Sequence, residues 1–212
     1  MILHDYLPSQ NAWKVRQLLA HLDRPYQTRE VAIFAGAGQS PDFLARNPAG
    51  AVPVLELDDG RCLAESNAIL AYLAEGTPYL PADPWQRAQV LRWLCFEADY
   101  VQGNIATLRH WVQTGKDARR DPALVAAKRA GSARVLGMLE RHLDGRAFLV
   151  ECGYSIADLA VYAYAHRADE AGVDLAPFPR FRAWCERVRA QPGFGVTVHP
   201  YSIDPESWRE LP

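Results

Sequence analysis

The chain has 212 residues, 49% hydrophobic and 23% charged, which is enough apolar material for a sizeable core and excludes a wholly disordered polypeptide. Its 23 basic and 25 acidic residues leave a formal charge of −2, so no global electrostatic attraction favours nucleic acid or an anionic membrane. No apolar run reaches the ~18–20 residues of a membrane helix, and the first ten residues lack the pattern of a signal peptide. We therefore expect a cytoplasmic protein without nucleic-acid or membrane partners.

Short apolar runs alternate with helical patterns over residues 1–77. Strands are predicted over Ile2–His4, Tyr26–Ile33, Val54–Leu57 and Arg61–Leu63. Helices are predicted over Ala12–Leu22, over a short segment opened by Ser40 and Pro41, and after a cap at Ser66. Asp58-Asp59-Gly60 is a strong hairpin signal between the last two strands. The order β-α-β-α-β-β-α predicts an α/β domain with a mixed sheet.

Three prolines punctuate residues 78–84, which we interpret as a linker. The chain beyond it, residues 85–212, is predicted to be an all-helical domain. Its helices are expected over Trp85–Trp111, Ala123–Leu143, Ser155–Arg167 and Phe178–Ala190. The proline-rich tail after Gln191 is expected to be irregular and to lie over the surface.

The four cysteines form no C-x-x-C pair and have no second metal ligand at a recognised spacing: Cys62, Cys95, Cys152 and Cys185. We expect reduced thiols, mostly buried as small apolar groups, and no metal site.

A hydroxyl and an amide, Ser9 and Asn11, lie between the first strand and the first helix. The unpaired N–H groups and the positive dipole end of a helix N-terminus stabilise an anion, including a thiolate. The alternative is that one of these side chains only caps the helix.

Two further segments offer groups to a peptide-like ligand. A cis Val52-Pro53 bond would turn the backbone N–H and C=O of Val52 outward, whereas a trans bond would make an ordinary turn. Glu65 and Ser66 could hold the ammonium and carboxylate of an α-amino acid head group; alternatively, Ser66 caps a helix and Glu65 is solvated. Ser155 and Asp158, by contrast, form the pattern of a capping box, which indicates a folding signal rather than a site.

In combination these segments resemble the cytosolic glutathione transferases, bacterial type. The resemblance rests on five elements in order: residues 9–16 (SQNAWKVR), 43–48 (FLARNP), 52–55 (VPVL), 65–70 (ESNAIL) and 155–158 (SIAD). It implies a thioredoxin-like N-terminal domain, an all-helical C-terminal bundle and a homodimer with each active site near the subunit interface.

The resemblance also implies residue roles. Val52, before a cis Pro53, would pair with the cysteinyl part of glutathione, and Glu65 with Ser66 would hold its γ-glutamyl head. Gln39, and less specifically Arg46, would approach the glycyl carboxylate. Either Ser9 or Asn11 would donate to the glutathione sulfur. Since a free thiol has a pKa near ~8.5, such donors favour the thiolate and lower that pKa.

The implied electrophile pocket is apolar. Six residues are candidates for its lining: Tyr6, Leu7, Phe34, Tyr100, Asn104 and Trp111. No cysteine lies in Ser9–Asn11, which disfavours members that react through a protein thiol.

Three functions follow from the resemblance. The first is a glutathione transferase, with a detoxification role, whose thiolate attacks a small electrophile or drives a glutathione-dependent reduction. The second is a non-catalytic binding or regulatory protein of the same fold. A glutathione-dependent isomerase ranks last, because such relatives usually carry a Ser-Ser-Cys element where this chain has Ser9-Gln10-Asn11.

Overall fold

In the computed structural model, which describes residues 1–211, the chain forms two units. Residues 1–75 group with 193–212 in the first unit, and residues 76–192 form the second. The tail after residue 192 therefore groups with the first unit, whereas the sequence analysis assigned it to the helical domain. The exact limits of the two domains and of the linker stay a prediction.

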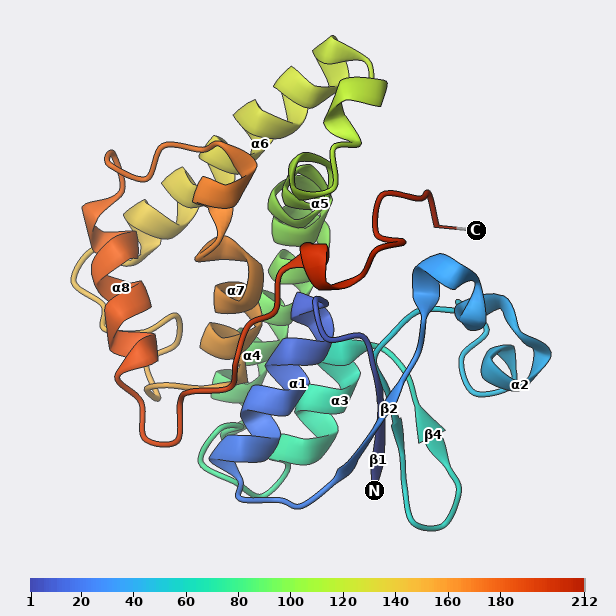
Figure 1. The fold of residues 1–212 in the computed structure, drawn as a ribbon. Helices are drawn as coiled ribbons and strands as arrows, with labels where there is room; N and C mark the ends of the chain where they lie inside the picture. Colours follow the sequence, from blue (N-terminus) through green and yellow to red (C-terminus); the bar gives the residue numbers. More distant parts are fainter. Residues whose placement is uncertain (212) are drawn as a thin grey trace. The chain divides into compact units, whose positions relative to one another are not determined.

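The first unit is a four-stranded mixed sheet with helices, as predicted. Its elements in chain order are β1 (Ile2–Asp5), α1 (Gln10–His21), β2 (Gln27–Glu30), α2 (Pro41–Leu44), β3 (Val54–Glu56), β4 (Cys62–Leu63) and α3 (Ser66–Ala74). The strand order is β2-β1-β3-β4, with β1 parallel to β2 and antiparallel to β3. Helices α1 and α3 lie side by side, and α2 lies on the other side of the sheet (Figure 1).

Burial explains why these elements form. Val15, Leu18 and Leu19 of α1 are fully buried, as are Val54 and Leu55 of β3, so the apolar stripe of the helix packs on the apolar centre of the sheet. The hairpin prediction is confirmed, because β3 and β4 pair antiparallel through a turn at Gly60, where φ is +84°.

The predicted strand over Tyr26–Ile33 was too long. Only Gln27–Glu30 pairs with β1, and all four residues are exposed. After Val31 the backbone turns into a short 3-10 segment, Ile33–Ala35, that ends at Gly36 with φ +87°. The β-branched residues of this stretch pack in the interior or the turn, which periodicity alone does not distinguish from a strand.

The second unit is helical, as predicted. Its helices are α4 (Pro84–Phe96), α5 (Thr107–Gln113), α6 (Pro122–His142), α7 (Ile156–Ala165) and α8 (Pro179–Arg189). Every residue of α7 is buried. The single helix predicted over Trp85–Trp111 is interrupted by a π-helical stretch, Glu97–Ala106, between α4 and α5. There the Thr107 hydroxyl donates to the Gln102 carbonyl five residues back.

The predicted capping box is present at the start of α7. The Ser155 hydroxyl accepts from the Ala157 N–H, and the Asp158 carboxylate accepts from the Ser155 N–H. Asp158 also accepts from the Leu149 N–H and from the Trp184 indole, each at 2.9 Å, so it joins α7 to a loop and to α8.

The expectation that most thiols are buried was wrong. Only Cys185 is buried; Cys62 is half-buried, and Cys95 and Cys152 are exposed. Cys95 lies on an outward face of α4 and Cys152 in the turn before α7, so neither position faces a core.

Candidate functional site

The loop between β1 and α1 carries Ser9, which caps α1. Its hydroxyl oxygen accepts from the Ala12 N–H at 3.2 Å, and its own N–H donates to the Tyr6 carbonyl at 2.8 Å. Ser9 therefore caps α1. The cap occupies a lone pair of the hydroxyl oxygen and leaves the hydroxyl proton as a donor, so Ser9 can cap the helix and still donate a hydrogen bond to a sulfur.

A buried ion pair holds this loop. Arg16 of α1 donates to the Asp5 carboxylate at 2.7 Å and to the Leu7 carbonyl at 2.9 Å. Both side chains are nearly inaccessible. The sequence reasoning assigned this pair no role. The sequence offered only a weak signal for this pair: an acidic residue at the end of a short strand and an arginine eleven positions later.

Helix α3 begins at Ser66, so Glu65 is its N-cap residue and the prediction of Ser66 as the cap was wrong. Glu65 has φ +66° and ψ 108°, a backbone region that L-residues rarely adopt and that concentrates at functional sites. The Ser66 N–H is in the first helical turn, where no intrahelical acceptor exists. Glu65 itself is exposed and forms no ion pair within residues 1–211.

Helices α1 and α3 meet at their N-termini. The Ser66 hydroxyl donates to the Asn11 side-chain oxygen at 3.3 Å. One turn further along α1, the buried Lys14 ammonium donates to the Asn67 side-chain oxygen at 2.8 Å. Two positive dipole ends and a lysine cation thus lie in one place, which favours a carboxylate or a thiolate there.

The peptide bond between Val52 and Pro53 is cis, as the resemblance implied. The Val52 side chain packs against Tyr6 and Phe34, and the Tyr6 carbonyl is the acceptor for Ser9. Within residues 1–211 the Val52 backbone N–H and C=O make no hydrogen bond, so both are available to an extended peptide.

Gln39 lies beside the segment that leads to Val52. A side chain at Gly50, where φ is +65°, would place its Cβ 2.5 Å from the Gln39 amide nitrogen. A Cβ at Gly38 would stand 2.2 Å from the Gly50 carbonyl, so glycine is required for this close approach. Arg46 is held elsewhere, 3.5 Å from the Glu56 carboxylate of β3.

Two predicted pocket residues, Tyr6 and Phe34, are buried against each other with ring centroids 5.7 Å apart. Tyr201, from the C-terminal tail, packs on Tyr6, and the Tyr6 hydroxyl donates to Asp204 at 2.8 Å. Burial, and then the Asp204 acceptor, raise the pKa of Tyr6 far above its usual value. Tyr6 is therefore a neutral phenol whose proton is directed at Asp204.

The sequence reasoning missed Tyr201 and Asp204. No signal could have found them, because the tail has no periodic pattern and these residues lie almost 200 positions from Tyr6. The remaining nearby candidate, Leu7, is half-buried, and its carbonyl is the acceptor for Arg16.

Three predicted pocket residues belong to the helical unit. Tyr100 is 49% exposed and stacks on Phe96 with centroids 5.2 Å apart, and the Asn104 amide donates to the Tyr100 carbonyl. The Arg120 guanidinium lies over the Trp111 ring at 5.3 Å. Their part in a substrate pocket stays a prediction.

Within the part of the chain that the structure describes, no group of three or more histidine, cysteine or acidic side chains is arranged to hold a metal ion. No helix among residues 1–211 has the length and apolar character needed to cross a membrane.

Comparison with known proteins gives two family matches. Residues 1–75 match the glutathione S-transferase N-terminal domain, and residues 104–192 match the C-terminal domain. A glutathione S-transferase from Xanthobacter autotrophicus Py2 has a similar structure, with a TM-score of 0.89 and 40% identity over 95% of this chain and 98% of that one.

Two further relatives bear on the chemistry. The Escherichia coli disulfide-bond oxidoreductase YfcG is 27% identical over 91% of this chain and 92% of its own length. A glutathione transferase from Burkholderia graminis, solved with two glutathione molecules bound per subunit, is 28% identical. The two structures superpose with a TM-score of 0.77, over 91% of this chain and 85% of the Burkholderia chain.

Proposed function

Because the chain belongs to the glutathione S-transferase family, we propose that it binds glutathione in its first unit and ionises the thiol for attack on a small electrophile. The observation that carries the proposal is the hydrogen bond between Asn11 and Ser66, which joins the N-termini of α1 and α3. It puts the residues suited to a thiolate beside those suited to an amino acid head group.

Each part of glutathione has a chemical counterpart. The unpaired backbone groups of Val52 suit the cysteinyl residue, which is then held as an added strand segment. The Glu65 carboxylate suits the γ-glutamyl ammonium, and the Ser66 N–H suits the adjoining carboxylate, to which the Ser66 hydroxyl would turn from Asn11 when the ligand binds. Gln39 can donate its side-chain amide to the glycyl carboxylate.

Thiol activation needs donors rather than a base. The Ser9 hydroxyl or the Asn11 amide donates to the sulfur, and the dipole of α1 adds its positive end. The resulting thiolate forms a bond to an electrophilic carbon, whose leaving group departs with its electron pair. Tyr6 is unsuited to activating the sulfur, because its proton is directed at Asp204.

A second candidate reaction is glutathione-dependent disulfide reduction. The similarity to an oxidoreductase favours it, as does the relative that binds two glutathione molecules, which are the components of glutathione disulfide. In that reaction the thiolate attacks one sulfur of a disulfide, a new S–S bond forms, and the other sulfur leaves as a thiolate. The attacking thiolate would belong to glutathione, because no cysteine lies in Ser9–Asn11.

We extend the proposal to a homodimeric, cytoplasmic detoxification enzyme. The support for a homodimer is the family resemblance, since members are usually homodimers. Sedimentation equilibrium measures the oligomeric state. A monomer at every protein concentration would contradict the proposed homodimer.

Calorimetric titration with glutathione tests the binding site. Glu65→Gln and Ser66→Ala are each expected to weaken affinity by about tenfold, since each removes a charge-assisted hydrogen bond. Glu75→Gln, at the opposite end of α3, is the matched control and is expected to bind as the wild type does. Wild-type protein without saturable binding would refute the proposal. Binding without turnover of aryl halides, hydroperoxides or disulfides would instead favour the non-catalytic alternative.

A further inference from the structure

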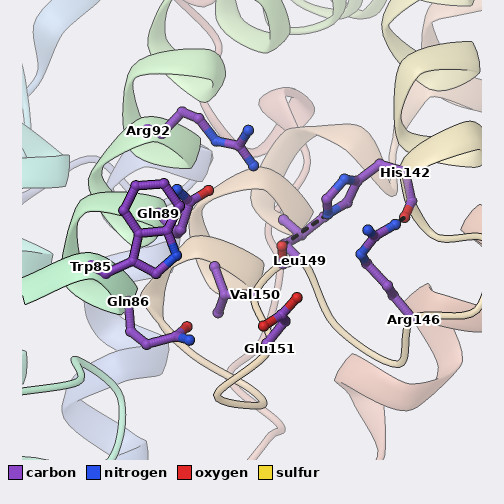
Figure 2. Close-up of a pocket in the computed structure, with 9 residues that line it drawn as sticks. All are labelled: Trp85, Gln86, Gln89, Arg92, His142, Arg146, Leu149, Val150 and Glu151. Carbon is purple, nitrogen blue, oxygen red and sulfur yellow. Dashed lines mark hydrogen bonds between the residues drawn. The ribbon is translucent and has the colours of Figure 1, made fainter. Parts of the chain in front are cut away.

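A cavity of about 280 Å³ lies in the helical unit (Figure 2). It is bounded by α4, by the end of α6 and by the loop that follows α6. Nine residues line it: Trp85, Gln86, Gln89, Arg92, His142, Arg146, Leu149, Val150 and Glu151. Its volume falls just below the ~300–1,000 Å³ of pockets for drug-sized ligands, so its occupant is small.

Two guanidinium groups face this cavity without an anionic partner. Within residues 1–211 no carboxylate lies within ion-pair distance of Arg92 or Arg146. Arg92 lies over the Trp93 ring, 5.3 Å from its centroid, and Arg146 donates to the His142 carbonyl at 2.8 Å. These contacts hold both cations near the cavity and leave most of their donors for another acceptor.

His142 lies between these two cations as a neutral ring. Its Nε2 donates to the Leu149 carbonyl at 2.9 Å, which leaves Nδ1 as an acceptor. Burial lowers the pKa of His142, and the positive charges of Arg146 and Arg92 lower it further. Arg92, His142 and Arg146 all line the same cavity.

The opposite wall carries a negative charge. Figure 2 shows the Arg92 and Glu151 side chains entering the cavity from different sides. Glu151 forms no ion pair among the described residues. Leu149 and Val150 are 2% and 5% exposed and make an apolar floor, and Trp85 is an exposed indole at the rim. Charges of both signs thus surround an apolar floor without pairing with each other.

We propose that this cavity binds a small zwitterion, an α-amino acid with an apolar side chain. Its carboxylate lies against Arg92 and Arg146, its ammonium against Glu151, and its side chain between Val150 and Trp85. A phosphate or another dianion fits less well, because Glu151 would face it without a counter-charge. The proposal stands apart from the glutathione site, since none of these residues belongs to the first unit.

Calorimetry with three probes of one shape tests the charge requirement. L-phenylalanine carries both charges, 3-phenylpropanoate only the anion and L-phenylalaninamide only the cation. Saturable binding of phenylalanine, with both analogues at least about tenfold weaker, is expected from the loss of one charged hydrogen-bond partner each. Equal binding of 3-phenylpropanoate, displacement by inorganic phosphate, or no saturable binding of phenylalanine would overturn the proposal.

Variants locate the site. Arg92→Gln and Arg146→Gln are each expected to weaken phenylalanine binding by about tenfold, and Glu151→Gln to abolish the preference over 3-phenylpropanoate. Arg134→Gln, an exposed arginine of α6 outside the cavity, is the matched control and is expected to bind normally. Loss of phenylalanine binding in Ser66→Ala, with the two arginine variants unaffected, would place the ligand at the glutathione site and refute this one.

Discussion

At the scale of single residues, the Tyr6 hydroxyl is the group whose environment most restricts the chemistry. A buried phenol that donates to a carboxylate does not ionise near neutral pH. Tyr6→Phe is therefore expected to leave the pKa of the bound glutathione thiol unchanged. It should still alter KM for the electrophile, because the hydroxyl fixes the tail residue Asp204.

The ultraviolet absorbance of the thiolate against pH measures the first quantity, and initial rates measure the second. Asp204→Asn is the companion variant, since it keeps the shape of the pair and removes the anionic acceptor. A rise of the thiol pKa by a full unit in Tyr6→Phe would assign Tyr6 to the sulfur and contradict this interpretation.

The candidate residues were predictable from sequence to different degrees. Ser9, Asn11, Val52 and Ser66 could be singled out because each sits at a helix start or beside a proline, where local chemistry carries the signal. The contacts that join them could not, since a hydrogen bond between Asn11 and Ser66 depends on how two helices pack. The polar partners on α1 were missed for the same reason: Lys14, Arg16 and Gln17.

At the scale of elements, Gln17 of α1 holds the C-terminal tail. Its fully buried amide donates to the Gly193 carbonyl and accepts from the backbone N–H groups of Gly195 and Val196. Gln17→Ala leaves these three backbone groups without that partner. We expect a loss of about 1–3 kcal/mol in the free energy of unfolding.

Urea denaturation measures that loss, and chymotrypsin cleavage at Tyr201 reports whether the tail detaches. Gln191→Ala, which removes a single bond to the Arg187 carbonyl, is the control and should cost less. Wild-type resistance to cleavage in Gln17→Ala would show that the tail is held by other contacts.

The capping box of α7 makes a prediction about pH. Burial raises the pKa of Asp158 from 3.8 to about 6. Between about pH 4 and 6 the native state therefore binds more protons than the unfolded chain, so this group's contribution to stability falls as the pH rises. Asp158→Asn removes that dependence.

The Asn variant is expected to be about 2–4 kcal/mol less stable than wild type at pH 4, because an amide cannot satisfy the same donors. Its deficit should shrink by up to about 3 kcal/mol by pH 7, since each pKa unit corresponds to about 1.4 kcal/mol. Ser155→Ala keeps the carboxyl but removes a hydrogen bond that lowers the Asp158 pKa, so its deficit should grow as the pH rises, opposite to that of Asp158→Asn. A constant deficit in Asp158→Asn would contradict the raised pKa.

Element types were largely predictable and their limits were not. The helices of the second unit follow from apolar periodicity and, for α7, from the cap at Ser155. The π-helical stretch at Glu97–Ala106 has the same apolar spacing as a plain helix, so its sequence does not reveal it. Strand β2 was overestimated because Val31 is buried and Ile33 partly buried without either belonging to a strand.

At the scale of the whole molecule, the chemistry proposed here uses the thiol of a bound peptide and none of the protein's own. Burial raises the pKa of Cys62, Cys152 and Cys185, the last to about 12, which makes them poor nucleophiles. A variant with Cys62, Cys95 and Cys152 all changed to serine is expected to keep the wild-type glutathione-dependent rate.

A thiol reagent provides the structural control. Cys95 should react in the native protein, Cys152 more slowly because its pKa is raised, and Cys185 only after denaturation because it is buried. A tenfold or greater fall in rate for the triple variant, with its fold intact by circular dichroism, would show that a protein thiol takes part.

The fold class itself followed from the resemblance and from the change of pattern near residue 77, and the structure has that fold. The place of the tail did not follow, because an irregular segment carries no periodicity to indicate which unit it joins. Its partners are Trp13, Gln17 and Tyr6, all near the other end of the chain.

The central claim is that Ser9 or Asn11 lowers the pKa of the bound glutathione thiol, and the thiolate absorbance against pH tests it most directly. In the wild type we expect that pKa at least one unit below the free value of ~8.5. Asn11→Ala or Ser9→Ala should restore the higher value and so identify the donor. Ser9→Thr, which keeps the hydroxyl and the cap, should not. A bound thiol with an unshifted pKa in the wild type, or a lowered pKa that both alanine variants retain, would contradict the claim.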